Sequence, residues 1–236
     1  MNNITKWDGM LQLVLFTLAA VIPILYIVNY GINWWAFSCT LMYFKLIQKI
    51  GGGGEHLLVV HGLARINSFG KIMIPLAWMM CGLTRLSFFA KYHIIHHYYV
   101  DTYKDPHSPK YFNMWYLIFG FWAIDAHKYD QFVEDNDAMH ASFSRSASVI
   151  DSGLVFQITD KYYYTILFSI ISITLYLNAA VAVYAVLLPL LLNIIDGNLF
   201  FVYLLHKGGK ARDIRWVNYW FFNTGSGLHR VHHRGL

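Results

Sequence analysis

The sequence predicts an all-α integral membrane protein: four transmembrane helices and a cytosolic helical cap that carries a histidine-rich di-metal site. Of its 236 residues, 57% are hydrophobic and only 13% are charged, whereas soluble domains carry about 25% charged residues. Several uncharged apolar runs are long enough to cross a bilayer. Eight of the twelve histidines gather in three clusters outside those runs. The runs predict the membrane part, and the clusters predict the site.

The four expected spans form two hairpins within one domain that covers residues 1–236. A short polar turn at 29–33 joins the first pair, and a turn near Asn178 joins the second. Neither turn contains Lys or Arg, so the positive-inside rule places both termini and the histidine clusters on the cytosolic side. The spans are residues 11–28, 34–50, 162–177 and 181–204, and the cytosolic or interfacial parts are 51–161 and 205–236.

The segments between the second and third spans are expected to be cytosolic or interfacial. Four glycines at 51–54 predict a flexible break. Residues 72–90 are apolar but would put the first two histidine clusters on opposite sides if they crossed, so we expect an interfacial or re-entrant helix. The aromatic segment 111–124 is expected to lie on the membrane surface. Residues 125–161 are the most polar part and are placed in the aqueous phase.

Charge and cysteine content exclude two function classes. The net charge of +5 comes without a basic run or an RNA-binding aromatic signature, so it indicates a positive membrane face and no nucleic-acid partner. Cys39 and Cys81 lie in apolar surroundings without a CxxC motif. We interpret them as buried, unpaired packing residues with no redox role.

The histidine spacing predicts metal binding, because neutral imidazole is a common ligand of iron, copper and zinc. Spacing of i, i+3 and i+4 lets one imidazole bind one metal while a neighbour reaches a second. Residues five apart point about 140° from each other on an ideal helix, so the first pair would suit different metals or a broken helix. The clusters are His56 and His61; His93, His96 and His97; and His229, His232 and His233.

Three motifs, taken in order, resemble those of the membrane fatty acid desaturases, in the Δ9-type acyl-CoA and acyl-lipid branch. They are GEHLLVVH (54–61), HIIHH (93–97) followed by DTYKDPHSP (101–109), and GSGLHRVHH (225–233). The resemblance runs from about residue 50 to the C-terminus. It implies a ninth ligand at the cytosolic end of the fourth span, where His206 matches. The implied ligands of two iron ions are His56, His61, His93, His96, His97, His206, His229, His232 and His233.

The activity implied by this resemblance is O2-dependent desaturation of a long-chain acyl group, with O2 as co-substrate. The acyl chain would be linked to CoA, a carrier or a lipid in the bilayer, and ferredoxin or cytochrome b5 would supply electrons. No catalytic residue is implied beyond the iron ligands. The chain departs from the family's pattern at 62–64 after the first motif, at Val202, and at Ser226 and Arg230 in the third motif.

Two other functions stay open at the level of sequence. A related di-iron membrane hydroxylase or ketolase, acting on a lipid or hydrocarbon, could share the ligand set, and product analysis separates it from a desaturase. A non-catalytic membrane protein that binds or transports metal would instead place ionisable residues at the bilayer midplane of its spans.

Several acidic residues are candidates for supporting roles. Asp101, Asp105, Asp125 and Glu134 could orient imidazoles, as carboxylates commonly do around metal ligands. Asp196 lies inside the fourth span, where burying a carboxylate is costly, and is therefore a functional candidate. The other histidines, His107, His127 and His140, are expected to be structural or on the surface.

Overall fold

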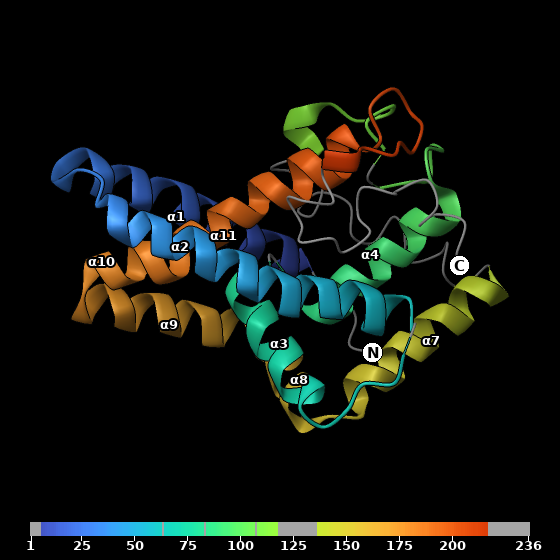
Figure 1. Cartoon of the computed structure of the whole chain (residues 1–236). Helices are drawn as coiled ribbons and strands as arrows, with labels where there is room; N and C mark the ends of the chain where they lie inside the picture. Colours follow the sequence, from blue (N-terminus) through green and yellow to red (C-terminus); the bar gives the residue numbers. More distant parts are fainter. Residues whose placement is uncertain (1–5, 63, 83, 107, 118–135, 217–236) are drawn as a thin grey trace.

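The computed structural model describes residues 6–62, 64–82, 84–106, 108–117 and 136–216 (Figure 1). Within these residues the chain is all-helical and contains no β-strand. The predicted all-α class is therefore confirmed for the described part. The third histidine motif lies outside it, as do residues 118–124 of the aromatic segment and the residues His107, Asp125, His127 and Glu134.

The first hairpin consists of α1 (Lys6–Tyr30) and α2 (Trp34–Ile47). The side chain of Asn33 caps α2 by accepting a hydrogen bond of 3.0 Å from the N–H of Ala36, so the chain turns where the sequence predicts. α1 has 25 residues and is about 37 Å long, more than the ~30 Å hydrocarbon core of a bilayer.

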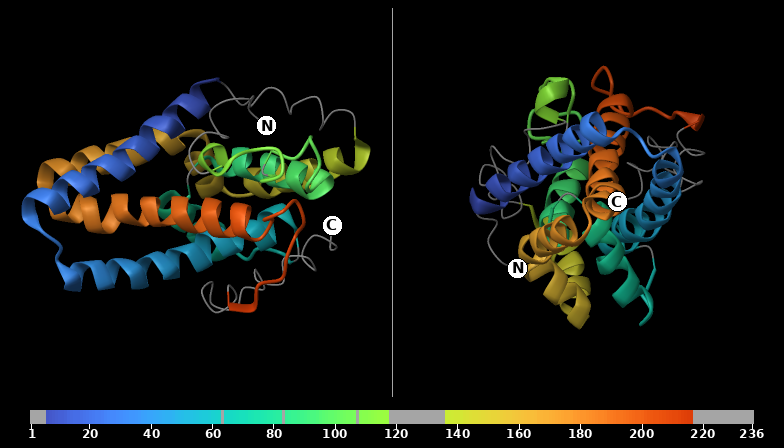
Figure 2. Two further views of the ribbon diagram at one scale, coloured as in Figure 1. Left: turned by 90° about the horizontal axis from the view of Figure 1, so that it is seen from above. Right: turned by 90° about the vertical axis from the view of Figure 1, so that its left-hand side faces the viewer.

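The second hairpin begins with α9 (Tyr163–Leu177) and turns at Asn178, whose side chain accepts from two N–H groups of the next helix. The returning helix is continuous but alternates between α and π winding. Its parts are α10 (Ala179–Val181), η5 (Ala182–Leu187), α11 (Leu188–Asn193) and η6 (Ile194–Leu204). Figure 2 shows this helix running between α1 and α2.

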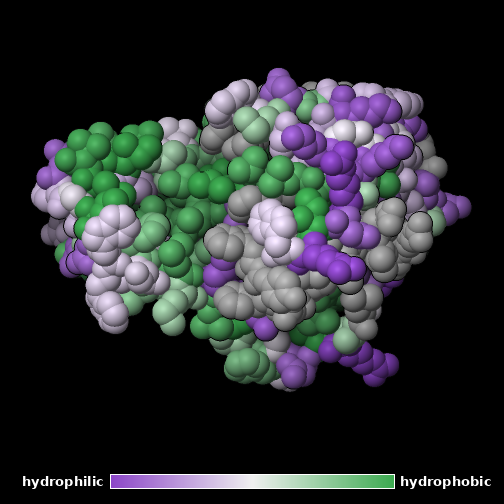
Figure 3. Space-filling view, turned by 45° about the horizontal axis from the view of Figure 1, so that its top comes forward, coloured by the Kyte–Doolittle hydropathy of each residue, from purple (hydrophilic) through white to green (hydrophobic). Residues whose placement is uncertain are grey.

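Two described helices, Trp7–Tyr30 and Ala179–Gly197, are long and apolar enough to cross a membrane, and a bent pair of helices would make a third. Figure 3 shows hydrophobic residues over the left and middle of the visible face, and the densest hydrophilic residues at its right. These features make a membrane protein plausible. α9 has only 15 residues, and the helix that begins with α2 is not among the candidate spans, so the four-span arrangement stays a prediction.

The bent pair is α3 (Gly70–Cys81) and α4 (Leu86–Tyr99), which meet at 84°. The apolar segment 72–90 is therefore two short helices, either a broken span or the re-entrant segment that the sequence predicts. Gly82 ends α3, where a Cβ would lie 2.5 Å from the indole ring of Trp78. The indole N–H of Trp78 then donates to the carbonyl of Thr84 at 2.7 Å, which fixes the bend.

The expected flexible break at the four glycines is wrong. The helix that begins at Trp34 continues through η1 (Gln48–Gly52), residues 53–54 and η2 (Glu55–Val60). A Cβ on Gly51 would lie 2.6 Å from the backbone nitrogen of Trp78. Gly51 thus permits close packing of η1 on α3 rather than a loose linker.

The polar part 137–161 folds as α7 (Asp137–Asp151) and α8 (Leu154–Lys161), which pack on α4 and α3. Two buried contacts hold the start of α4. Asp160 accepts the Ser87 N–H at 2.8 Å, and the Arg85 guanidinium pairs with Asp8 at 2.7 Å. α1 and α8 therefore fix the position of the helix that carries the HIIHH motif.

The main core lies where α1, α3, α4, α8, α9 and α11 meet, with buried residues such as Leu15, Trp78, Phe156 and Leu187. Both cysteines are free, as expected. Cys81 is buried, but Cys39 is exposed because it lies on an outward face of α2. The prediction that both thiols are buried was wrong for Cys39.

Candidate metal centre

Four histidines from two helices converge on one position: His56 and His61 at η2, and His93 and His97 on α4. One nitrogen from each lies within 4.8 Å of the others. The Nε2 atoms of His93 and His97 are 3.0 Å apart, and the rings of His56 and His93 have centroids 4.5 Å apart. We call this set the four-histidine group; it can hold a metal ion.

The winding of η2 explains how His56 and His61 meet. A π-helix closes its turns with hydrogen bonds between residues five apart, and the His61 N–H donates to the His56 carbonyl at 3.2 Å. Residues five apart therefore lie one above the other, instead of about 140° apart as on an α-helix. Of the two alternatives left open by the sequence, the structure shows a distorted helix, which brings both imidazoles to one group.

One turn of α4 divides its imidazoles between two positions. His93 and His97 join the four-histidine group, whereas the ring of His96 lies beside that of His206, with centroids 4.7 Å apart. His206 follows η6 and is only 1% exposed. We call these two residues the His96–His206 pair. The three imidazoles of this cluster thus lie in two groups, and the binding of two metals by one HxxHH cluster stays a prediction.

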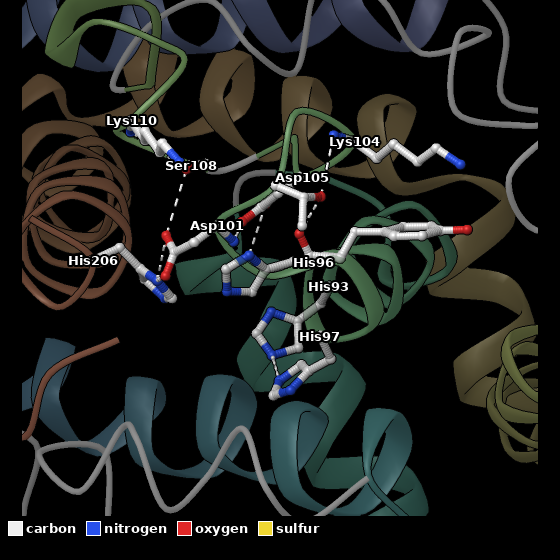
Figure 4. A network of polar contacts seen from close by, with 11 residues as sticks. His93, His96, His97, Asp101, Lys104, Asp105, Ser108, Lys110 and His206 are labelled. Carbon is white, nitrogen blue, oxygen red and sulfur yellow. Dashed lines mark hydrogen bonds and ion pairs between the residues drawn. The ribbon is translucent and has the colours of Figure 1, made fainter. Parts of the chain in front are cut away.

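Two carboxylates of the 101–109 loop contact the His96–His206 pair (Figure 4). Asp105 is fully buried, and its Oδ1 lies 2.8 Å from Nδ1 of His96. Asp101 lies 3.4 Å from Nδ1 of His206. Because an ionised carboxylate can only accept, such a contact requires a proton on Nδ1, and a neutral imidazole then presents the lone pair of Nε2 to a metal. Asp101 and Asp105 thus lie where they can orient both imidazoles, as the sequence suggested.

The backbone of the loop links the two carboxylates. The Asp101 N–H donates to Oδ2 of Asp105 at 2.8 Å, so Asp105 holds His96 with one oxygen and Asp101 with the other. Asp101 has φ of +59°, a left-handed conformation that Asp tolerates better than most residues. The hydroxyl of the buried Ser108 donates to Asp101 at 3.4 Å. A short loop thereby supports both members of the pair.

Burial favours the neutral form of one member of the four-histidine group. Burial, together with the neighbouring imidazoles, lowers the pKa of His93 well below its usual value. A neutral imidazole has the lone pair that a metal requires, and four histidines within reach of one ion fit a transition metal such as iron, copper or zinc.

Sequence reasoning missed Glu55, which lies next to His56. Its side chain is fully buried and neither carboxylate oxygen has a hydrogen-bond partner among the described residues. Burial raises the pKa of Glu55 well above its usual value. No sequence signal marked it, because an acid beside a glycine run is typical of an exposed turn.

The remaining predicted ligands, His229, His232 and His233, lie outside the described residues. Comparison of the chain with protein-family models, curated proteins and solved structures finds no match. What is established is therefore the geometry: one four-histidine group, and a carboxylate-supported histidine pair whose His96 lies on the same turn of α4 as His93 and His97.

Proposed function

We propose that the chain is a membrane-bound non-haem di-iron oxidoreductase that desaturates a long-chain fatty acyl group, of the Δ9 type, with O2. The observation that carries this proposal is the division of one HxxHH cluster between two adjacent imidazole groups. Two neighbouring metal positions are what a di-iron centre requires. The order of the histidine motifs and the DPHSP sequence support an acyl substrate.

The overall reaction removes one hydrogen from each of two adjacent methylenes. One O2, two electrons and two protons are consumed together with these hydrogens, which leaves a C=C bond and two waters. Two bound irons would supply oxidising power sufficient for unactivated C–H bonds. The electrons would come from an external carrier such as ferredoxin or cytochrome b5.

The chain's own residues would bind and orient the centre. The four-histidine group would hold one iron. His96 and His206 would hold the other, with His229, His232 and His233 completing the ligand set. Asp105 and Asp101 keep the proton of each supported imidazole on Nδ1, which directs Nε2 to the metal.

Aromatic packing would help to exclude water from the four-histidine group. The ring of Phe89 stacks on His93 with centroids 5.2 Å apart and planes at 13°. Buried residues of α4, among them Phe88 and Tyr92, continue this apolar surface. A dry environment protects a reactive oxidant from side reactions and favours an acyl chain over a polar substrate.

The test is fatty acid profiling by mass spectrometry in a host that expresses the chain with an electron donor. A His96→Ala/His97→Ala variant removes one imidazole from each group. His140→Ala is the matched control, because His140 is an exposed histidine of α7. We expect a new mono-unsaturated acid with wild type and the control, and none with the double variant.

Other outcomes separate the alternatives. An oxygenated product would favour the di-iron hydroxylase or ketolase and reject desaturation. Purified wild type that is folded but binds no iron would reject the di-iron proposal. Purified protein with two irons and a competent donor, but no altered lipid or hydrocarbon, would argue against an oxidoreductase of this substrate class.

A further inference from the structure

A buried polar cluster joins α2 to η6 away from the histidines. Lys45 Nζ lies 2.6 Å from Oδ2 of Asp196, and the two side chains are only 10% and 3% exposed. The Gln48 amide donates to Asp196 at 3.2 Å and to Asn193 at 3.3 Å, while its oxygen accepts from Lys45 at 3.2 Å. All four polar side chains are therefore directed at one another across the helix interface.

The cluster lies where both helices change their winding. α2 passes into η1 at Gln48, and α11 passes into η6 at Ile194. From there each helix runs to a candidate metal ligand: His56 is eleven residues beyond Lys45, and His206 is ten residues beyond Asp196. The two intervals are therefore nearly equal in number of residues. The cluster thus lies at the start of two helical segments, α2–η1–η2 and η6, which lead to different parts of the candidate metal centre.

The energetics of such a pair favour a role in alignment over a role in stability. Desolvation offsets most of the Coulomb attraction of a buried ion pair, and replacement by apolar residues is often neutral or stabilising. A polar contact does, however, select one register, since a slip of one helical turn, about 5.4 Å, would leave two buried charges unpaired. Apolar packing along the same interface has no comparable preference.

We propose that the Lys45–Asp196 ion pair, with Gln48 and Asn193, sets the register between the α2–η1–η2 arm and η6. In this register the ring of His206 lies beside that of His96, and the ring of His56 lies beside that of His93. Lys45 and Asp196 are thereby positioning residues for the metal centre. The inference rests on the proposed function only in that it takes the His96–His206 pair to bind a metal.

The decisive variant is the apolar double replacement Lys45→Met/Asp196→Leu, because it removes the register contact without leaving a buried charge alone. Lys45→Met and Asp196→Leu are made singly for comparison. Thr40→Val is the matched control: Thr40 donates to the Tyr184 carbonyl at 2.7 Å across the same helix interface, farther from the histidines. Each protein is purified in detergent, and its thermal midpoint and bound iron per chain are measured.

A second readout does not require metal. His96→Cys and His206→Cys are introduced together in a Cys39→Ser/Cys81→Ala background, with and without the apolar double replacement. A short thiol-to-thiol cross-linker then reports on the alignment of the two positions, whose rings lie 4.7 Å apart in the native chain.

We expect the apolar double variant to keep a thermal midpoint close to wild type and to retain one iron. Its second iron should bind about tenfold more weakly, as for loss of other positioning contacts around metal ligands, and its cross-linking yield should fall severalfold. Thr40→Val should retain both irons.

Native iron binding and native cross-linking in the double variant would overturn the inference. So would a double variant that fails to fold, because the pair would then be a stability element. If wild type itself binds no second iron, the di-iron proposal fails, and the cross-linking result still decides the inference.

Discussion

The four-histidine group and the His96–His206 pair are built in different ways, although they share one turn of α4. In the four-histidine group, π winding brings His56 over His61, and i, i+4 spacing brings His93 over His97. In the pair, a loop carboxylate holds each imidazole, and the two residues are 110 positions apart in the sequence. Local helix geometry thus defines one position, and tertiary contacts define the other.

This difference indicates how each position can fail. A ligand change or a distortion of η1 and η2 should damage the four-histidine group first. Changes in the 101–109 loop should damage the pair first. Four sets of variants separate the two positions, in order of expected effect.

Removing one ligand from the four-histidine group should have the largest effect. His61→Ala leaves three imidazoles there and does not touch the His96–His206 pair, so we expect loss of one metal ion per chain. Product formation should fall by about 100-fold or more, since ligand loss should exceed the 10–100-fold effect of losing a supporting contact. Elemental analysis and product profiling measure both effects. Unchanged metal content would show that this group is not a metal site.

Removing the carboxylate of Asp105 should weaken metal binding selectively at the His96–His206 pair. Asp105→Ala deletes the acceptor for His96 and for the Asp101 N–H. We expect metal affinity at the pair to fall about 10–100-fold, with the four-histidine group unaffected. Asp105→Asn retains one acceptor oxygen and should recover part of the loss. Metal titration by calorimetry distinguishes the two positions, and equal weakening of both would contradict the comparison.

The substitution Gly51→Ala should disturb the four-histidine group through helix packing, without changing a ligand. In Gly51→Ala the new Cβ would lie 2.6 Å from the backbone of α3, so η1 must shift, at a cost of about 1–3 kcal/mol in unfolding free energy. Gly53→Ala is the control, because a Cβ there meets nothing within 4 Å and Ala favours helix by up to about 1 kcal/mol. Thermal midpoints should therefore move in opposite directions. A shift of the same sign in both variants would reject the close-packing role of Gly51.

The smallest effect concerns Asp160. Its carboxylate accepts a hydrogen bond from the Ser87 N–H and so caps the start of α4, the helix that contributes to both positions. Burial is the main cause that raises the pKa of Asp160 above 3.8, so folding favours its protonated form. This contribution is complete below pH 3.8 and is lost as pH rises through the folded pKa. Asp160→Asn, which keeps an acceptor for the Ser87 N–H, should abolish that loss. Asp160→Ala should cost about 1 kcal/mol at all pH values because the cap is gone.

Thermal midpoints of wild type and the two Asp160 variants, followed from pH 3.5 to neutral pH, test this pH dependence. The wild-type midpoint should fall relative to that of Asp160→Asn as pH increases, and a relative rise would contradict the expected sign.

Composition and the polar breaks between apolar runs predicted the helical class and both hairpin turns. Asn33 and Asn178 cap the helices that begin after them, and a polar residue after a long apolar run is readable from sequence. The spacing of His93, His96 and His97 also predicted that α4 serves two positions. These features depend on local periodicity, which a sequence contains directly.

Features that depend on tertiary packing were not predicted. Gly51–Gly54 is typical of a loop, and only the close approach of α3 explains why glycine is required within a helix. Glu55 is buried because η1, η2 and α3 pack together, which its neighbours in sequence do not indicate. Asp196 was marked by its place in an apolar run, but its partner Lys45 lies 151 residues away. The third histidine motif remains a prediction.

The π winding of η2 has a consequence for chain length. Residues five apart on a π-helix occupy the relation that residues four apart have on an α-helix, where they differ by about 40°. Deleting one residue between His56 and His61 would thus allow an ordinary α turn to keep both imidazoles on one side. The turn at Gly62, with φ of +62°, could absorb the resulting rotation of the chain beyond it. The spacing of this motif is therefore tied to helix type, and a chain one residue shorter could carry the same pair.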